Sequence, residues 1–281
     1  MIPWDDVQTR YKSTGRSLSL IGSYGRHYAK CEQVLAANPD HVEALLCRGY
    51  GLEKLGRYEE AIATFERVIT FCPQNSLAWQ GRGISLGRLC QYEDALTSFN
   101  QSLKLDPQDY RGWQNQGKTL LNLGRYQEAI ASFDQVISFK PDSYKAWYNR
   151  AIALSSLNEY ASALTDVDIA LKIKPNSDYI WTYRGMMLTR LTRYLEASAS
   201  FENSLKINSR NSSAWYGRAC CFALQGKSEE ALQSLKRAIQ LSPSIYRSMA
   251  DTDANLQSLR VDSRFQALIQ TSSEEIGSPH L

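Results

Sequence analysis

The residues most suggestive of chemistry lie in the run Gly112–Thr119, which matches the phosphate-binding pattern G-x-x-x-x-G-K-[ST] at every fixed position. In that motif the loop follows a buried strand and a helix begins at the lysine, so that backbone N–H groups surround a phosphate. Here the run follows the turn-forming residues Asp106–Asp109 instead, and Trp113 and Gly117 recur at a fixed period along the chain. We therefore expect Gly112–Thr119 to lie within a helix and to bind no nucleotide.

The sequence contains few residues suited to bind a metal or to act as a general acid or base. His27 and Cys31 are four residues apart, as two metal ligands on one helix face would be. No second pair of ligands accompanies them, and both fall where core residues are expected. The chain has 3 histidines and contains neither a G-x-S-x-G nor an H-E-x-x-H motif. The sequence therefore predicts a protein that is not an enzyme, with no catalytic residues, no cofactor and no metal.

Composition excludes several classes of protein. Hydrophobic residues make up 43% of the 281 residues and charged residues 22%, which excludes collagen-like and highly charged disordered chains. No run approaches the ~20 apolar residues that a membrane-spanning helix needs, and no secretion signal is visible. The formal net charge of +3 is too small to indicate nucleic-acid binding. The 6 cysteines include no C-x-x-C pair, so we expect unpaired, small buried side chains and a reducing, cytoplasmic compartment.

Four residue types share one period along the chain. Tryptophan recurs every 34 residues, and tyrosine, alanine and proline follow the same spacing at other positions. The periodic tryptophans are Trp79, Trp113, Trp147, Trp181 and Trp215. Within one period, apolar residues follow helical spacing in two runs, the first ended by a glycine such as Gly124 and the second by a proline such as Pro141. Each period therefore predicts a pair of helices, which buries its apolar faces by stacking on neighbouring pairs.

These periods resemble tetratricopeptide repeats (TPRs), whose pattern is W-x-x-L-G-x-x-Y…A-x-x-x-F…P. In residues 76–109 the matching side chains are Trp79, Gly83, Leu86, Ala95, Phe99 and Pro107. The resemblance implies an all-α fold, a right-handed α-solenoid of about seven 34-residue helix-turn-helix repeats followed by a C-terminal capping helical segment.

The seventh position of each repeat departs from the usual leucine. In five repeats this position is an arginine: Arg48, Arg82, Arg150, Arg184 and Arg218. This W-x-x-R-G form resembles bacterial multi-repeat TPR arrays. We expect the arginines to form a ladder with acidic residues on the second helices, such as Glu66, Asp168 and Glu202.

The resemblance also sets the expected domain organisation. Residues 1–7 are a lead-in, residues 246–271 are capping helices and residues 272–281 are a disordered tail. The repeats between them are 8–41, 42–75, 76–109, 110–143, 144–177, 178–211 and 212–245. The first repeat is atypical, with His27 where alanine belongs, as terminal repeats often are.

In TPR proteins the first helix of each repeat lines a concave face, and the resemblance assigns its positions 2, 5, 6, 9, 12 and 13 to that face. Basic residues outnumber acidic ones at these positions. The acidic residues there are Glu43 and Glu53. The basic residues are Lys54, Arg88, Arg111, Lys118, Lys145 and Arg190. Tyrosines also occur at these positions, and cations beside aromatic rings suit an extended peptide with acidic side chains.

The resulting candidate peptide-binding residues are Arg111, Gln114, Asn115, Lys118, Lys145, Tyr148, Asn149, Tyr179, Tyr183, Arg190 and Tyr216. One TPR subtype clamps a C-terminal carboxylate, and its pattern is matched here only by Asn115 and Lys145. We therefore expect a looser site for an acidic peptide rather than a full carboxylate clamp.

The sequence predicts a non-enzymatic protein–protein interaction scaffold or adaptor that holds an extended, acidic peptide segment in its concave groove. Two alternatives stay open. One is a regulatory or sensor subunit that controls a partner enzyme in a larger complex. The other is an RNA-binding helical repeat, although the basic residues lack the fixed code positions that such repeats use. We expect a protein or peptide partner and no membrane insertion, we do not expect nucleic acid, and self-association stays open.

Overall fold

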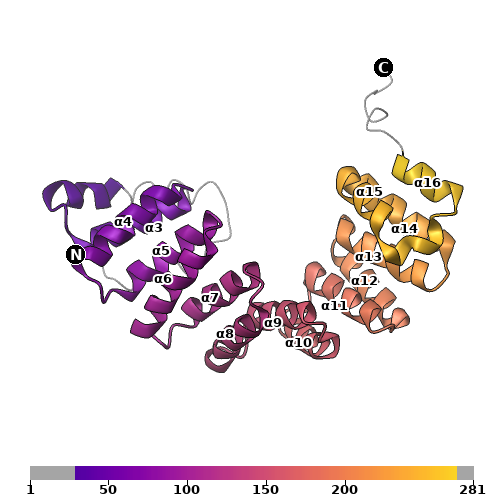
Figure 1. Cartoon of the computed structure of the whole chain (residues 1–281), viewed down its shortest axis with the longest axis horizontal. Helices are drawn as coiled ribbons and strands as arrows, with labels where there is room; N and C mark the ends of the chain where they lie inside the picture. The colour runs from indigo at the N-terminus through magenta and orange to yellow at the C-terminus, as the bar shows by residue number, and fades with distance from the viewer. Residues whose placement is uncertain (1–28, 271–281) are drawn as a thin grey trace, which may run out of the picture. The chain divides into compact units, whose positions relative to one another are not determined.

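The computed structural model describes residues 29–270, and every regular element in that range is a helix (Figure 1). The expectations for His27, for the lead-in 1–7 and for the tail 272–281 lie outside the described residues. The chain divides into two compact units, an N-terminal unit up to Arg125 and a C-terminal unit from Tyr126. The boundary falls inside the predicted repeat 110–143.

The N-terminal unit consists of stacked helical hairpins. After a helical stretch at residues 29–37, its helices are α3 Val42–Lys54, α4 Tyr58–Phe71, α5 Ser76–Arg88, α6 Tyr92–Leu105 and α7 Tyr110–Asn122. Helix α3 packs on α4, α4 on α5, α5 on α6, and α6 on α7. This is the packing that the period of 34 residues predicts.

The C-terminal unit continues the same pattern and ends in a short cap. Its paired helices are α8 Tyr126–Phe139, α9 Tyr144–Ser156, α10 Tyr160–Ile173, α11 Asp178–Arg190, α12 Tyr194–Ile207, α13 Ser212–Leu224 and α14 Ser228–Leu241. The cap consists of α15 Pro243–Thr252, the 3-10 helix η1 Ala254–Leu259 and α16 Ser263–Gln270. The predicted all-α fold of consecutive helix pairs is therefore confirmed in the described residues. None of the described helices combines the length and apolarity that crossing a membrane requires.

Side chains and turns fix where the helices begin. The Asn75 side chain accepts a hydrogen bond from the backbone N–H of Ala78 at 3.0 Å, and Asn211 does the same for Ala214 at 3.0 Å. Each bond satisfies a donor that the first turn of a helix leaves unpaired. After the last turn of α7, Gly124 takes a positive φ of 72°, a conformation that costs glycine no steric strain.

The core of each hairpin stack depends on a phenylalanine held between two glycines. Phe65 of α4 is 0% exposed. A Cβ atom built on Gly49 would lie 2.6 Å from its ring, and one on Gly81 would lie 2.3 Å from it. Phe201 lies in the same way between Gly185 and Gly217 in the C-terminal unit. The glycines of two successive first helices therefore form the slot that this ring fills.

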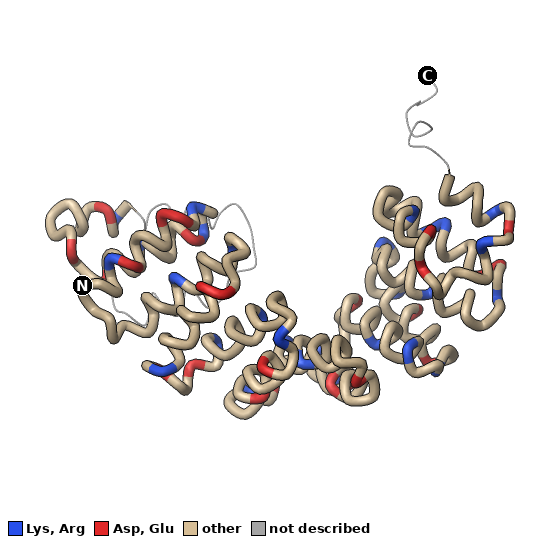
Figure 2. The backbone as a smooth tube through the Cα atoms, viewed as in Figure 1, with Lys and Arg blue, Asp and Glu red and all other residues tan. Residues whose placement is uncertain are grey.

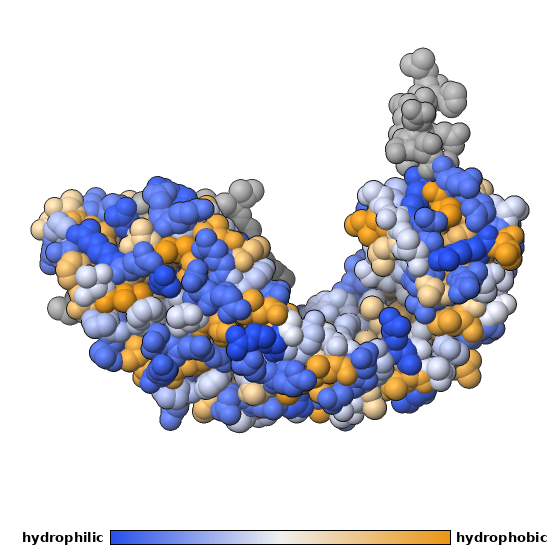
Figure 3. Space-filling model, viewed as in Figure 1, coloured by the Kyte–Doolittle hydropathy of each residue, from blue (hydrophilic) through white to orange (hydrophobic). Residues whose placement is uncertain are grey.

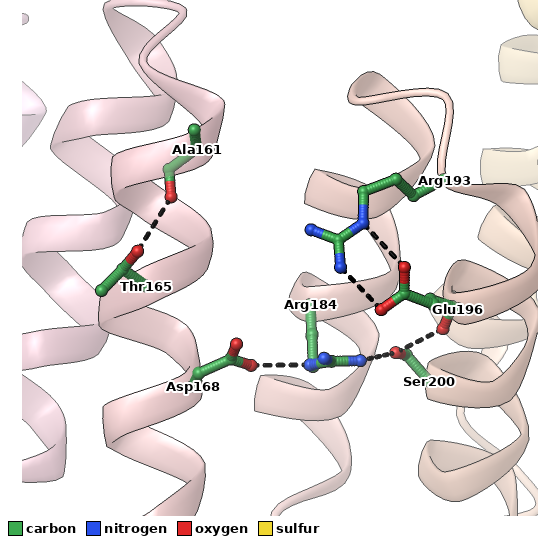
Figure 4. Close-up of polar contacts among 7 residues, drawn as sticks. All are labelled: Ala161, Thr165, Asp168, Arg184, Arg193, Glu196 and Ser200. Carbon is green, nitrogen blue, oxygen red and sulfur yellow. Dashed lines mark hydrogen bonds and ion pairs between the residues drawn. The ribbon is translucent and has the colours of Figure 1, made fainter.

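The predicted arginine ladder is confirmed at several repeats. The Nε atom of Arg184 lies 2.7 Å from Asp168 on the preceding second helix, and its Nη1 donates to Ser200 at 2.8 Å (Figure 4). Arg82 and Glu66 form the equivalent pair at 3.0 Å. At these repeats the ladder ties the first helix to the second helix of the preceding repeat.

Two rungs of the ladder differ from the expectation. Where the arginine is replaced by Gln116, the amide donates to Asn100 at 2.7 Å, so an amide pair takes the place of the ion pair. Arg218 does not pair with Glu202; its guanidinium lies over the Trp215 and Phe222 rings at 5.4 and 5.2 Å, and its Nε is buried without a hydrogen-bond partner. The aromatic neighbours of Arg218 hold the guanidinium in this position.

The expectation that the cysteines are unpaired is wrong for two of them. Cys31 and Cys47 form a disulfide that ties the helical stretch 29–37 to α3. The free cysteines in the described residues are Cys72, Cys90, Cys220 and Cys221, and only the last two are buried. Disulfides persist mainly in oxidising compartments, so this pair removes the basis for inferring a reducing one.

The surface mixes charge and hydropathy throughout. Basic and acidic residues both occur along the helices of the two units, separated by uncharged stretches (Figure 2). On the face shown in Figure 3, hydrophobic residues form small groups scattered among hydrophilic ones. A binding site must therefore be sought in local arrangements of side chains.

Candidate peptide-binding site

The run that matches the phosphate-binding pattern is helical, as predicted. Gly112–Thr119 lies inside α7, whose first turn is capped by the Asp109 carboxylate through the backbone N–H groups of Arg111 and Gly112. The Thr119 hydroxyl donates to a backbone carbonyl of the same helix at 2.9 Å. Among the described residues, no group of three or more His, Cys, Asp or Glu side chains is placed to hold a metal ion.

A cavity of about 210 Å³ opens between α5 and α7 of the N-terminal unit. It brings two predicted residues, Asn115 and Lys118, together with Arg88 of α5. The remaining lining residues are Gly83, Ile84, Gly87, Tyr92, Phe99, Thr119 and Asn122. The cavity thus combines an apolar wall with two cations and two side-chain amides, and no carboxylate lines it.

Gly87 and Arg88 are the features of this cavity that the candidate set missed. A Cβ atom on Gly87 would have no other atom within 4 Å, so the missing side chain leaves the space open. The repeat pattern indicates this missing side chain, because other first helices carry a residue with a side chain, Glu53 or Ser155, at the position of Gly87. Glu53 is buried, and its carboxylate lies 2.9 Å from Lys54 Nζ and 3.8 Å from Arg88 Nε.

The other predicted residues of α7 do not line the cavity. The Arg111 guanidinium lies over the ring of its neighbour Tyr110, 5.5 Å from the centroid. The Gln114 side chain holds its amide nitrogen buried with no hydrogen-bond partner. Buried amides without partners are uncommon in native structures, and both N–H donors of this amide lack one.

In the C-terminal unit the structure gathers three of the predicted tyrosines. Tyr148 of α9 meets Tyr179 and Tyr183 of α11 edge to face, with centroids 5.2 and 5.3 Å apart. The Tyr183 hydroxyl is hydrogen-bonded to the Ser155 hydroxyl. Burial, with a smaller contribution from the neighbouring tyrosines, raises the pKa of Tyr148 to about 12. These rings form a fixed aromatic surface between α9 and α11.

Lys174 borders this tyrosine cluster. Lys174 donates to the Tyr144 hydroxyl at 3.1 Å, and its ammonium lies 4.4 Å from the centroid of the Tyr144 ring and 5.8 Å from that of Tyr179. Lys145 and Asn149 lie on α9 beside Tyr148, and Arg190 is exposed in the last turn of α11. Lys174 was not predicted, because it lies at the end of a second helix rather than on a first helix.

Tyr216 does not join the other tyrosines. It is buried, its ring stacks on Tyr246 of α15 at 4.9 Å, and its hydroxyl donates to Asp253 at 2.8 Å. Helix η1 packs against α13, and burial beside Asp253 raises the pKa of the Cys220 thiol well above its ordinary value. The C-terminal cap therefore covers this part of α13, and Tyr216 contributes to the cap.

Substituting Tyr148 with phenylalanine is expected to reduce the loss of stability between about pH 10 and about pH 12. The pKa of Tyr148 is about 12 in the folded protein, whereas that of an unfolded tyrosine is about 10. The neutral phenol therefore contributes stability that is fully present below about pH 10 and is lost as the pH rises through about 12. Urea unfolding of both proteins at about pH 9 and about pH 11.5 measures this difference. Parallel losses in the two proteins would contradict it.

Two family models match the chain. One, described as tetratricopeptide repeat, matches residues 29–76, 81–144 and 115–178, and another with the same description matches residues 212–245. The first alone covers more than half of the chain. Among curated proteins, no sequence matches the chain.

Many solved structures share the fold. YrrB, described as a TPR protein with an unusual peptide-binding site, is 20% identical with a TM-score of 0.55, over 67% of this chain and 98% of that one. A tetratricopeptide repeat protein from Parabacteroides merdae is 16% identical with a TM-score of 0.62, over 82% and 92%. The pilF protein of Pseudomonas aeruginosa is 15% identical with a TM-score of 0.63, over 75% and 97%. At these identities the likeness shows the fold alone.

Proposed function

Because the chain belongs to the tetratricopeptide repeat family, generally a protein-binding and typically non-catalytic module, we propose that it is an adaptor that binds an extended acidic peptide of a partner protein. Each unit by itself offers first helices on which such a peptide can lie, the α5–α7 face in the N-terminal unit and the α9–α11 face in the C-terminal unit. YrrB is described as having a peptide-binding site, which supports peptide binding as the activity of such a fold.

The observation that carries the proposal is that cations meet an apolar or aromatic surface on these faces. In the α5–α7 cavity, Arg88 and Lys118 lie beside Ile84 and Phe99, with no carboxylate in the lining. Arginine and tyrosine are enriched in protein interfaces because they combine apolar area with hydrogen-bonding or charged groups.

The α9–α11 face repeats this chemistry with tyrosines. Tyr148 and Tyr183 are held by their ring contact, so they lose little conformational freedom when a ligand packs on them. Lys145 and Asn149 lie on the same helix as Tyr148 and supply a charge and an amide. An amide of this kind can hydrogen-bond the backbone of an extended peptide.

A charge-reversal experiment tests the proposal. A phage-displayed library of random dodecapeptides is selected on the immobilised full-length protein, and the enriched peptides are measured by fluorescence polarisation. We expect enrichment in aspartate and glutamate. Lys118→Glu should weaken peptides that bind the α5–α7 face, and Lys145→Glu those that bind the α9–α11 face, by about tenfold or more, which corresponds to about 1.4 kcal/mol for a lost charge contact. Circular dichroism should be unchanged.

Matched controls come from the second helices of the same units. Lys104 of α6 and Lys172 of α10 are exposed lysines outside the proposed faces. Lys104→Glu and Lys172→Glu should leave the affinity within about twofold, because they change only the general charge. Enrichment of peptides without acidic residues, or equal losses in the control and test variants, would refute the adaptor proposal in this form.

The cytoplasmic location stays a prediction. The Cys31–Cys47 disulfide counts against it, because thiols in a reducing compartment are kept unpaired.

A further inference from the structure

We propose that the α5–α7 cavity binds one oxyanion of the partner peptide, the carboxylate of an aspartate or glutamate or the phosphate of a phosphorylated serine or threonine. This inference rests on the proposed peptide-binding function and names the side chain that anchors the peptide. Asn115 and Lys118 were candidate residues. Gly87, Arg88 and Asn122, which were not, complete the lining of the pocket around them.

The cavity has room for one ligand side chain. Its volume of about 210 Å³ exceeds the roughly 150 Å³ of an engineered protein cavity that binds benzene. Ile84 and Phe99 supply apolar wall that can contact the methylene groups of a ligand side chain. Gly87 keeps the space open, because any larger residue there would project a side chain where no other atom now lies within 4 Å.

The polar lining consists of groups that favour an anion. Arg88 and Lys118 carry positive charge, and Asn115 and Asn122 offer amide N–H donors. A guanidinium presents paired N–H groups that match a carboxylate or a phosphate, and hydrogen bonds between charged groups are about twice as strong as neutral ones. The cavity lining contains no carboxylate that would repel such a ligand.

The long ion pair with Glu53 leaves the Arg88 guanidinium available to a ligand. Glu53 lies 2.9 Å from the Lys54 ammonium but 3.8 Å from Arg88 Nε. Lys54 therefore provides the closer counter-ion for the buried Glu53 carboxylate. The Arg88 side chain stays more than half exposed and still lines the cavity.

The residue at the position of Gly87 differs in other first helices. At the position of Gly87, the preceding first helix carries Glu53, which is buried in its own ion pair. Two repeats later the position carries Ser155, whose hydroxyl bonds to Tyr183. The combination of a glycine with a following arginine is what opens a charged pocket between α5 and α7.

Nuclear magnetic resonance of the full-length protein tests this directly. The side-chain amide signals of Asn115 and Asn122 are followed during titration with N-acetyl-glutamate N-methylamide and with N-acetyl-phosphoserine N-methylamide. N-acetyl-glutamine N-methylamide is the neutral probe of matching shape. We expect saturable shifts with at least one anionic probe and none with the neutral one. The probe that saturates at lower concentration identifies carboxylate or phosphate as the natural group.

Three variants separate pocket binding from general charge. Gly87→Leu fills the cavity and should abolish the shifts. Arg88→Gln should weaken binding by about tenfold, whereas Lys104→Gln on α6, which removes the same charge outside the cavity, should leave it unchanged. If Gly87→Leu fails to fold, the comparison of Arg88→Gln with Lys104→Gln decides alone.

Two results would overturn the inference. One is a response to the glutamine probe equal to that of the anions. The other is retention of the shifts in a folded Gly87→Leu protein or in Arg88→Gln. A selected peptide that binds the wild-type and Gly87→Leu proteins equally, yet is weakened by Lys145→Glu, would reject the pocket and keep the adaptor function. Selection of no peptide at all would reject the adaptor function itself.

Discussion

Replacing Arg150 with methionine is expected to lower the free energy of unfolding by about 3–5 kcal/mol. Arg150 donates from Nε and Nη2 to the two carboxylate oxygens of Asp166, each at 2.7 Å, and it also bonds Asp134. Asp166 is only 3% exposed. Methionine keeps the apolar stem but removes the cation, and it leaves a buried carboxylate without its counter-ion. Urea unfolding followed by circular dichroism measures the loss.

Arg184→Met is the matched control. Arg184 occupies the same repeat position, but its acidic partner Asp168 is 42% exposed and its other partner is the Ser200 hydroxyl. Water can solvate the Asp168 carboxylate after the substitution, so we expect a loss of about 1 kcal/mol or less. Equal losses for Arg150→Met and Arg184→Met would show that burial of the acid does not decide the cost.

A second substitution should rescue Arg150→Met. Serine stands in place of Asp166 in neighbouring repeats, as Ser132 and Ser200, and each of these hydroxyls donates to a carbonyl one turn earlier in its own helix. Asp166→Ser therefore removes the unpaired charge and supplies a group that the position already accommodates. The double variant should recover most of the lost stability, and a double variant as unstable as the single one would contradict this explanation.

The arginine ladder shows how far the repeat alone could predict the structure. The pairs of Arg82 with Glu66 and of Arg184 with Asp168 follow from one spacing of 16 residues between a second helix and the next first helix. The disulfide follows from the same spacing, because Cys31 and Cys47 are also 16 residues apart, directly beside the rung of Glu32 and Arg48. The sequence therefore contained the signal for this disulfide, which a search for C-x-x-C pairs missed.

The candidate site was harder to predict because it depends on features outside the period. Tyr216 sits at a predicted groove position, yet it is covered by the cap, whose sequence does not repeat. The cavity between α5 and α7 exists because Gly87 lacks a side chain, and pattern reasoning looks for side chains that are present. The acidity of the ligand and the likeness to bacterial W-x-x-R-G arrays stay predictions.

Replacing Phe65 with alanine is expected to cost about 3–5 kcal/mol of unfolding free energy. The ring is 0% exposed, lies edge to face on Tyr50 with centroids 5.0 Å apart, and fills the slot between Gly49 and Gly81. The glycines that line the slot have no side chains that could move into the vacated space. Phe71 of the same helix is 51% exposed, so Phe71→Ala should change stability by no more than about 0.5 kcal/mol.

A double-mutant cycle with Gly81 tests whether the ring and the glycine are matched in shape. In the wild-type protein, Gly81→Ala places a Cβ atom 2.3 Å from the Phe65 ring and should destabilise the fold by about 1–3 kcal/mol. In the Phe65→Ala background the same methyl group enters the vacated space and gains helix propensity over glycine, worth about 1 kcal/mol. Gly81→Ala should therefore change sign between the two backgrounds. An effect of the same sign and size in both would mean that the glycine is not required by the phenylalanine.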